Sequence, residues 1–414
     1  MSLPVYLSTI ERPSRGRLAF MGGNVLALGT VSLITDVSSE MVTAILPLYL
    51  VLGLGAGPLA YGVLDGVYTG ATAVLRIVGG FVADRVRSRK LVAGLGYGLS
   101  ALAKPALLLA GRSVPAVGLV IAADRLGKGL RTAPRDALIT EAVPPSQLGR
   151  AFGLHRTMDA VGAFLGPLVA LGVLALTAGS YDAVFVTSFC VAALAVVVLV
   201  LFVREKAAAA SPVAAIRLGD AVRLLADARL RRLVVAAGLL GLATIGDGFV
   251  YLLLQRREEL SVVWFPLLAV GTSLSYLLLA TPLGVLADRI GRLPVLAGGG
   301  VALAVTYLLL TGPLGGPPLL VLVLGLYGLF YAATDGVLMA LAGPLLPAGL
   351  RATGLALVQT AQALTYLVSS VLFGLAWQTW GPAGAGRAAA LLAVVALAGI
   401  VLLLRNRTRP EVAR

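Results

Sequence analysis

The stretch Gly284-Val-Leu-Ala-Asp288-Arg289-Ile-Gly291-Arg292 decides the fold of this 414-residue chain. It lies between two long apolar runs, and a related stretch, Gly80-Phe-Val-Ala-Asp84-Arg85, lies between two others in the first half of the chain. A motif that returns after roughly 200 residues indicates that one structural unit has been duplicated.

The composition excludes a soluble multidomain protein. Hydrophobic residues make up 59% of the chain and charged residues only 13%, whereas a soluble domain has about 25% charged residues. A membrane-spanning helix needs about 20 apolar residues, and twelve candidate runs fall into two sets of six. We therefore predict an all-α membrane protein with twelve transmembrane helices in two pseudo-symmetric six-helix bundles. The runs are 20–50, 58–83, 91–111, 114–139, 150–177, 182–203, 232–254, 262–287, 294–311, 317–343, 352–376 and 385–405.

The predicted division of the chain places one bundle at 1–203 and the other at 232–414. A cytoplasmic linker at 204–231 joins them, and its stretch Leu218–Leu230 predicts an amphipathic helix on the membrane surface. We expect no cleavable signal peptide, because the first apolar run is too long for one.

The net charge of +14 is explained by topology. Lys and Arg gather on every second connection, and this bias predicts a multi-pass protein of the cell membrane with both termini in the cytoplasm. A nucleic-acid partner is not expected, since no soluble basic domain exists to bind one. The predicted outer loops hold few basic residues, namely Arg112, Arg256, Arg257 and Arg387.

Neither a disulfide framework nor an enzyme site is expected. The chain has one cysteine, Cys190, which excludes a disulfide framework and a thiolate metal cluster. Metalloprotease, nucleophile-elbow and phosphate-binding signatures are absent from the sequence, so we predict a membrane transporter without a cofactor.

The motifs resemble those of the major facilitator superfamily. The stretch 284–292 matches the loop signature of that family, while its counterpart has Arg87 in place of the second glycine. Arg125-Leu-Gly-Lys128-Gly129 is similar to the span-4 arginine motif, with lysine in the usual glutamine position. Gly162-Ala-Phe-Leu-Gly166-Pro167 resembles the glycine-proline motif of exchangers. The resemblance implies alternating access, as in proton-coupled drug and metabolite exporters, and names no substrate.

The same resemblance implies a cytoplasmic gate. Asp84 would pair with the start of the eleventh span near Arg351, and Asp288 with the start of the fifth span near Gly149. These contacts would form when the cytoplasmic side is closed. The predicted gate residues are Gly80, Asp84, Arg85, Gly284, Asp288, Arg289 and Arg292.

Charged side chains inside the first bundle predict proton coupling. Asp36 and Glu40 stand four residues apart on one helix face, where their repulsion favours proton uptake. A charge facing lipid at mid-membrane costs at least about 2.5 kcal/mol, so Arg125 must face protein or water. We predict Asp36, Glu40, Arg125 and Asp159 as the coupling groups. Two alternatives stay open: a structural role of Asp36 as a cap or hydrogen-bond partner of a neighbouring span, and an internal ion-pair lattice of the span-4 charges.

Polar and aromatic residues suggest a cavity for a small amphipathic organic compound, although helix packing alone would also explain them. The predicted lining is Lys128, Arg131, His155, Asp247, Tyr251, Tyr327, Tyr331, Asp335 and Gln359. His155 and Asp159 with Asp36 and Glu40 are weak candidates for a divalent metal site, which the single histidine argues against.

These features favour proton-coupled export, that is, antiport, of a small amphipathic organic compound. The expected partners are that substrate, protons and the lipid bilayer, and nothing in the sequence requires more than a monomer. The alternatives are an importer or facilitator of an organic anion held by Arg125, Lys128 and Arg131, a divalent metal transporter, and a receptor that transports nothing.

Overall fold

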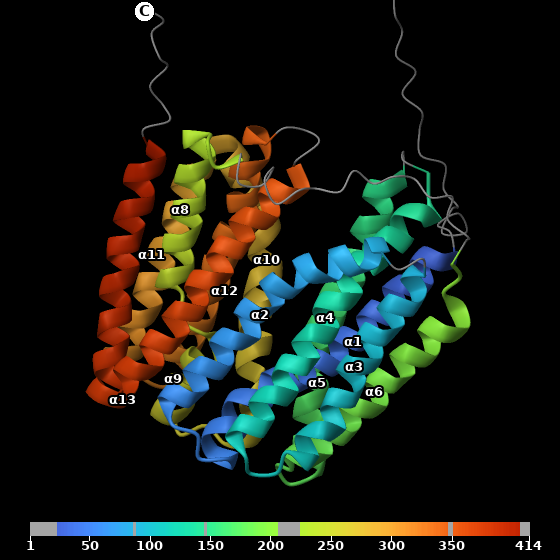
Figure 1. The fold of residues 1–414 in the computed structure, drawn as a ribbon. Helices are drawn as coiled ribbons and strands as arrows, with labels where there is room; N and C mark the ends of the chain where they lie inside the picture. The colour runs from blue at the N-terminus through green and yellow to red at the C-terminus, as the bar shows by residue number, and fades with distance from the viewer. Residues whose placement is uncertain (1–22, 86–87, 145–146, 206–223, 347–350, 406–414) are drawn as a thin grey trace, which may run out of the picture.

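A computed structural model describes residues 23–85, 88–144, 147–205, 224–346 and 351–405, without the side chains of 71, 73–85, 133, 148–149 and 351–353. The described residues form helices joined by short loops, and they contain no strand (Figure 1). The first bundle consists of α1 (Gly23–Leu48), α2 (Pro58–Arg85), α3 (Arg89–Leu109), α4 (Val114–Ala142), α5 (Leu148–Leu176) and α6 (Tyr181–Phe202). A π-helical turn at Tyr49–Gly53 extends α1.

The second bundle consists of α8 (Ala228–Ala243), α9 (Asp247–Arg257), α10 (Pro266–Ile290), α11 (Arg292–Thr311), α12 (Pro317–Ala342) and α13 (Arg351–Arg405). Two short 3-10 helices, Val262–Trp264 and Gly343–Leu345, lie in its connections.

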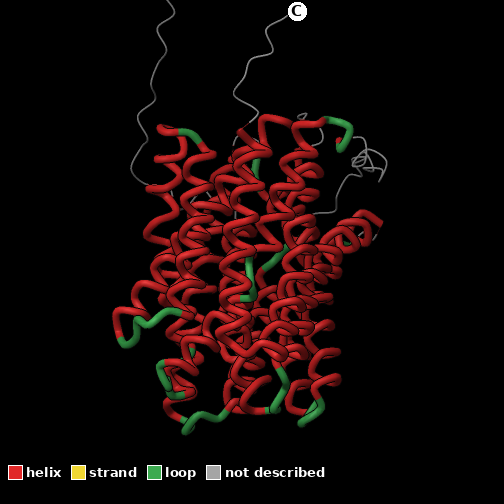
Figure 2. Tube along the Cα trace, turned by 90° about the vertical axis from the view of Figure 1, so that its left-hand side faces the viewer, coloured by secondary structure: helices red, strands yellow, loops and turns green. Residues whose placement is uncertain are grey.

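Two irregularities reconcile these helices with the predicted spans. α13 holds two spans joined at Gly381, whose φ of 73° is a conformation that glycine adopts without strain. α8 and α9 together form one span, interrupted at Thr244–Gly246 (Figure 2). With these two adjustments the described residues hold twelve spans, as the sequence predicts. Residues 218–223 of the predicted linker helix lie outside the described residues. The described part is not one continuous helix, because residues 225–227 form a turn before α8 begins at Ala228.

Side-chain caps explain where several helices begin. The side chains of Ser88, Ser113 and Ser180 each accept a hydrogen bond from the backbone N–H three residues later, and Asp227 caps α8 in a similar way. Such caps satisfy donors that the first helical turn leaves without a partner, and each typically stabilises a helix by about 1 kcal/mol. The loops are thus fixed by local sequence.

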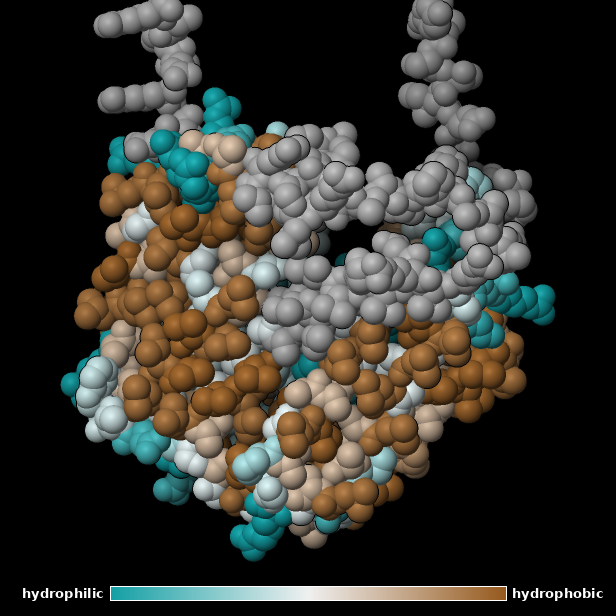
Figure 3. Space-filling view, in the orientation of Figure 1, coloured by the Kyte–Doolittle hydropathy of each residue, from teal (hydrophilic) through white to brown (hydrophobic). Residues whose placement is uncertain are grey.

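On the side of the molecule that Figure 3 shows, both bundles present mostly apolar residues at the surface. Large hydrophobic side chains such as Leu278, Val321 and Leu391 are 66%, 71% and 67% exposed. Exposed apolar surface of this extent is typical of a lipid-facing protein. By length and composition, nine helical stretches of the described residues qualify as membrane spans, and one of them covers both halves of α13.

The two bundles form a V. They meet at one end and separate toward the end where α1 begins and α13 finishes (Figure 1). α2 packs against α13, and α5 packs against α10. Gly62 and Gly66 of α2 lie directly against the α13 backbone at Ser370 and Leu367, where any larger side chain would collide. The small residues therefore permit the tight junction that closes one end of the V.

Candidate functional site

A cavity of about 350 Å³ lies between the two bundles. α1, α2 and α5 of the first bundle and α9, α10, α12 and α13 of the second all contribute side chains to it. The polar lining residues are Glu40, Thr43, Tyr61, Asp65, Tyr68, Thr69, Asp247, Tyr251, Thr272, Ser273, Tyr276, Tyr331, Asp335 and Tyr366. This central cavity is placed where relative movement of the bundles would change access to it.

The break in the seventh span lies directly before Asp247, which lines the central cavity. Asp247 begins α9, and its Oδ1 accepts hydrogen bonds from the hydroxyls of Tyr331 at 2.5 Å and Tyr327 at 2.7 Å. Asp247 lies in the first turn of α9, where the helix dipole stabilises a negative charge. Both tyrosines come from α12, so the carboxylate ties α12 to the broken span.

Two buried tyrosines satisfy the backbone groups that the break exposes. The backbone N–H of Ile245 donates to the Tyr307 hydroxyl at 3.0 Å, and that hydroxyl donates to the carbonyl of Ala243 at 3.2 Å. The Tyr327 hydroxyl also lies 3.3 Å from the carbonyl of Ile245. Non-helical backbone at membrane depth needs such partners because no water replaces them. The break is therefore a built feature of the second bundle, and the sequence analysis did not anticipate it.

Asp65 connects the two bundles. Its Oδ2 accepts a hydrogen bond of 2.5 Å from Ser370 of α13, and the hydroxyl of Tyr61 lies 3.5 Å from its Oδ1. Gly246 in the broken span passes so close to this carboxylate that a Cβ there would collide with it. Asp65 thus lies at the junction of α2, α13 and the break.

The first bundle contains a separate ion-pair lattice. The Nζ of Lys104 in α3 lies 2.6 Å from Oδ1 of Asp124 in α4, and Arg125 binds Oδ2 of the same carboxylate through Nε at 3.1 Å. The Arg125 guanidinium also lies 3.8 Å from the centroid of the Tyr68 ring. All three charged side chains are buried. Asp124 is therefore the ion-pair partner of Arg125, as in the alternative of an internal lattice on the fourth span.

Lys104 was missed in the sequence analysis. It is 3% exposed and lies in the middle of the apolar run at 91–111. A lone lysine inside a membrane span is costly unless it is paired, and this was the signal that could have identified it.

Asp36 and Glu40 share one side of α1, but only Glu40 lines the central cavity. Lys128 of α4 interacts electrostatically with both carboxylates. Within the described residues it forms no ion pair closer than 4 Å, so this cation acts on Asp36 and Glu40 without being tied to either.

Several predicted cavity residues lie elsewhere in the first bundle. Arg131 is buried with its guanidinium 4.7 Å from the centroid of the Tyr97 ring. His155 is buried beside Asp159, with Nδ1 3.2 Å from Oδ1. Arg131 thus faces α3, and His155 contacts a residue of its own helix; neither belongs to the described lining of the central cavity.

The remaining predicted residues divide in the same way. Asp247, Tyr251, Tyr331 and Asp335 line the central cavity, whereas Lys128, Tyr327 and Gln359 are not in its described lining. Tyr327 lies behind Asp247 as its hydrogen-bond donor, and Gln359 is exposed on α13.

The weak metal candidates do not converge. His155 and Asp159 form a pair on α5, whereas Asp36 and Glu40 lie on α1. Among the residues that the structure describes, no three His, Cys, Asp or Glu side chains are placed to hold one metal ion.

The predicted gate lies at the open end of the V. Asp288 and Arg289 are exposed where α10 ends, and Arg292 begins α11 and donates to the carbonyl of Ala340 at 2.7 Å. Gly284 is exposed on the last turns of α10. The side chains of Asp84, Arg85 and Arg351 lie outside the described residues, as does the side-chain environment of Gly80 and Gly149, so the pairing of Asp84 with Arg351 stays a prediction.

The glycine-proline motif packs α5 against α1. Gly162 lies against the backbone of Leu33, and Gly166 against the backbone between Val37 and Met41, with no room for a Cβ in either place. Pro167 lines the central cavity. The motif therefore seats Glu40, which is next to Gly166, at the cavity wall.

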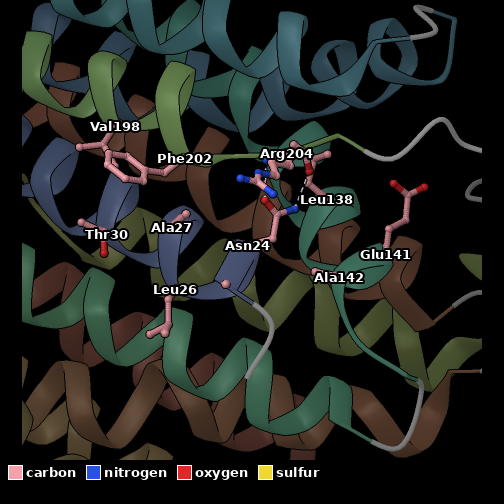
Figure 4. A pocket seen from close by; sticks show the side chains of 11 residues that line it. Asn24, Leu26, Ala27, Thr30, Leu138, Glu141, Ala142, Val198, Phe202 and Arg204 are labelled. Carbon is pink, nitrogen blue, oxygen red and sulfur yellow. Dashed lines mark hydrogen bonds between the residues drawn. The ribbon is translucent and has the colours of Figure 1, made fainter. Parts of the chain in front are cut away.

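A larger cavity, of about 690 Å³, lies at the end of the first bundle where α1 begins (Figure 4). α1, α4 and α6 line it, and Asn24 at its rim exchanges hydrogen bonds with the backbone of Arg204. No described residue of the second bundle contributes to this cavity. Rocking of one bundle against the other would not alternate its access, so the central cavity is the better candidate site.

The sequence of the chain matches a family model for the Major Facilitator Superfamily over residues 28–272 and 261–414. This chain belongs to that family. An uncharacterized MFS-type transporter of Methanocaldococcus jannaschii is 32% identical over 362 residues, which cover 86% of this chain and 88% of that one. An uncharacterized protein of Mycobacterium tuberculosis is 39% identical over 157 residues, or 38% of each chain. The protein is thus a multi-pass membrane transporter and not an enzyme.

Solved structures share the fold at low sequence identity. A mutant of the nucleoside transporter NupG superimposes with a TM-score of 0.80 at 16% identity, covering 92% of this chain and 99% of that one. A bacterial homologue of the human lysosomal transporter Spinster, in an inward-facing and unoccupied conformation, gives a TM-score of 0.75 at 16% identity, covering 96% and 100%. At these identities the likeness concerns the fold alone.

Proposed function

We propose that this family member is a proton-coupled exporter that exchanges protons for a small amphipathic organic compound by alternating access. The observation that carries the proposal is the central cavity, because both bundles line it and it combines carboxylates with tyrosine rings. Carboxylates in a cleft that water reaches can bind and release protons, and tyrosines offer apolar faces with polar tips.

Asp36 and Glu40 are the proposed proton-coupling groups, with Lys128 as the cation that responds to them. When both carboxylates are charged they attract Lys128, and when they are protonated that attraction is lost. The electrostatic link between α1 and α4 then changes with the protonation state. In this proposal Arg125 stays paired with Asp124 and does not take part in proton exchange. Asp159 likewise stays paired with His155.

The membrane orientation is also a proposal. We place the protein in the cell membrane, with the start of α1 and the end of α13 on the cytoplasmic side. In this orientation the open end of the V faces the cytoplasm. The α2–α13 junction then closes the outer side, and the loop residues around Asp288 form the inner gate when it shuts. We propose that the bundles at 1–203 and 232–414 turn as two rigid bodies, joined by the linker at 204–231, when the transporter changes its access.

Uptake of an organic anion has less support. It depended on Arg125, Lys128 and Arg131 facing the substrate, but Arg125 is paired with Asp124, and Arg131 lies over Tyr97. None of the three is in the described lining of the central cavity.

The test is transport into reconstituted vesicles under an imposed pH gradient. We expect accumulation of an amphipathic compound against its own gradient, driven by protons. Asp36→Asn and Glu40→Gln should each abolish the accumulation while substrate exchange without a gradient continues. Asp182→Asn, an exposed carboxylate at the start of α6, is the matched control and should behave as wild type. Wild-type transport that only equilibrates the compound and is unaffected by pH and membrane potential would overturn the coupling.

A further inference from the structure

The lining of the central cavity carries charge of one sign. Glu40, Asp65, Asp247 and Asp335 face it, and no Lys, Arg or His is among its described lining residues. A carboxylate in a low-dielectric site is costly unless a proton or another cation accompanies it. An anionic occupant would increase that cost, whereas a cationic one would reduce it.

The four carboxylates differ in their protein partners. Asp247 accepts hydrogen bonds from two tyrosine hydroxyls, and Asp65 accepts one from the hydroxyl of Ser370. Among the described residues, Glu40 and Asp335 have no hydrogen-bond donor, although Lys128 acts on Glu40 through space. Glu40 belongs to the first bundle and Asp335 to the second. These two side chains are therefore the ones available to an occupant, and they approach it from opposite bundles.

Tyrosine rings complete the lining. Six of them contribute: Tyr61, Tyr68, Tyr251, Tyr276, Tyr331 and Tyr366. The face of an aromatic ring attracts a cation within about 6 Å, and the attraction grows as water is removed. The protein already uses this interaction itself, since the guanidinium of Arg125 lies over Tyr68. The rings also provide apolar surface for the body of an organic molecule.

We propose that the transported compound is an organic cation with an apolar or aromatic body, held between Glu40 and Asp335 and against the tyrosine rings. This substrate class rests on the proposed transport function. A bare metal ion fits less well, because the carboxylates of the described residues do not gather around one point. Since Glu40 is also a proposed proton site, the cation and the proton compete for the same carboxylate, which is the basis of exchange.

The test compares two probes with one frame and opposite permanent charges, benzyltrimethylammonium and phenylmethanesulfonate. Equilibrium binding to the purified full chain is measured for each. We expect the ammonium compound to bind and the sulfonate to bind at least about tenfold more weakly, which corresponds to the loss of one moderately screened charge contact. Tighter binding of the sulfonate, or equal binding of both, would overturn the proposal.

Variants locate the contact. Asp335→Asn should weaken binding of benzyltrimethylammonium about tenfold, and Asp335→Glu should restore most of it, because the charge returns. Asp182→Asn should leave the affinity unchanged. Thermal unfolding of each variant confirms that it is folded. Wild-type affinity in a folded Asp335→Asn variant would contradict the proposed contact.

The experiment separates this inference from the proposed function. Equilibrium binding needs no gradient, so selective binding of the ammonium probe without proton-driven transport would support the substrate class and overturn proton coupling. Proton-driven accumulation of the sulfonate but not of the ammonium compound would support proton coupling and overturn the substrate class.

Discussion

Two groups of buried charges, one inside each bundle, are held in different ways: the ion-pair lattice of α3 and α4, and Asp247 at the broken span. In the first bundle, Lys104 and Arg125 share the carboxylate of Asp124 where α3 packs against α4. In the second bundle, Asp247 faces the central cavity at a broken helix and is held only by neutral hydroxyls. A duplicated unit has thus kept its helix arrangement while its polar interior diverged. The α3–α4 lattice of the first bundle is closed within that bundle, whereas Asp247 and Asp335 of the second bundle face the central cavity, as Glu40 and Asp65 do from the first.

The largest expected effect concerns the ion-pair lattice. Asp124→Asn leaves Lys104 and Arg125 buried without a counter-charge, and breaking a buried pair costs about 3–5 kcal/mol. Asp247→Asn keeps an oxygen that accepts the tyrosine hydroxyls, so we expect a loss of at most about 1 kcal/mol. Thermal unfolding in detergent measures both. Equal losses for the two variants would show that the bundles do not differ as described.

A smaller effect is expected at the break in the seventh span. Tyr307→Phe leaves the N–H of Ile245 and the carbonyl of Ala243 without their partner, which costs about 1–3 kcal/mol. The matched control is Tyr97→Phe in the first bundle, whose buried hydroxyl has no hydrogen-bond partner among the described residues. That variant should unfold at the wild-type temperature or above it. If Tyr97→Phe proves the more destabilising change, the hydroxyl network at the break is not what stabilises it.

The smallest effect is expected where the two bundles meet. Ser370→Ala removes the hydrogen bond to Asp65, which is worth about 0.5–1.5 kcal/mol, and should favour separation of α2 from α13. Thr43→Cys in a Cys190→Ser background provides a thiol in the central cavity. Its labelling from outside the cell by an impermeant reagent should rise about threefold to tenfold. Ser273→Ala, at another lining hydroxyl, is the control. No increase relative to that control would show that the Asp65 contact does not hold the outer side closed.

The sequence predicted the spans well, because a helix in lipid must bury its backbone and needs a long apolar stretch. It did not predict the partners of the charged residues. Lys104 and Asp124 meet through the relative rotation of α3 and α4, which no single-helix pattern specifies. The break at Thr244–Gly246 was also missed, because its short sequence is compatible with a continuous apolar span. The hydroxyls that support it come from positions 62 and 82 residues away.

Proton release on ligand binding tests the central claim most directly. Benzyltrimethylammonium carries a fixed charge, so any proton that appears when it is mixed with the purified protein in weakly buffered solution comes from the protein. Wild-type protein should release up to about half a proton per bound cation at the pH where Glu40 is half protonated, rising toward about one at lower pH. Glu40→Gln should release almost none while still binding. Binding by the wild type without release at any pH across the titration range would contradict exchange of cation and proton at a shared carboxylate.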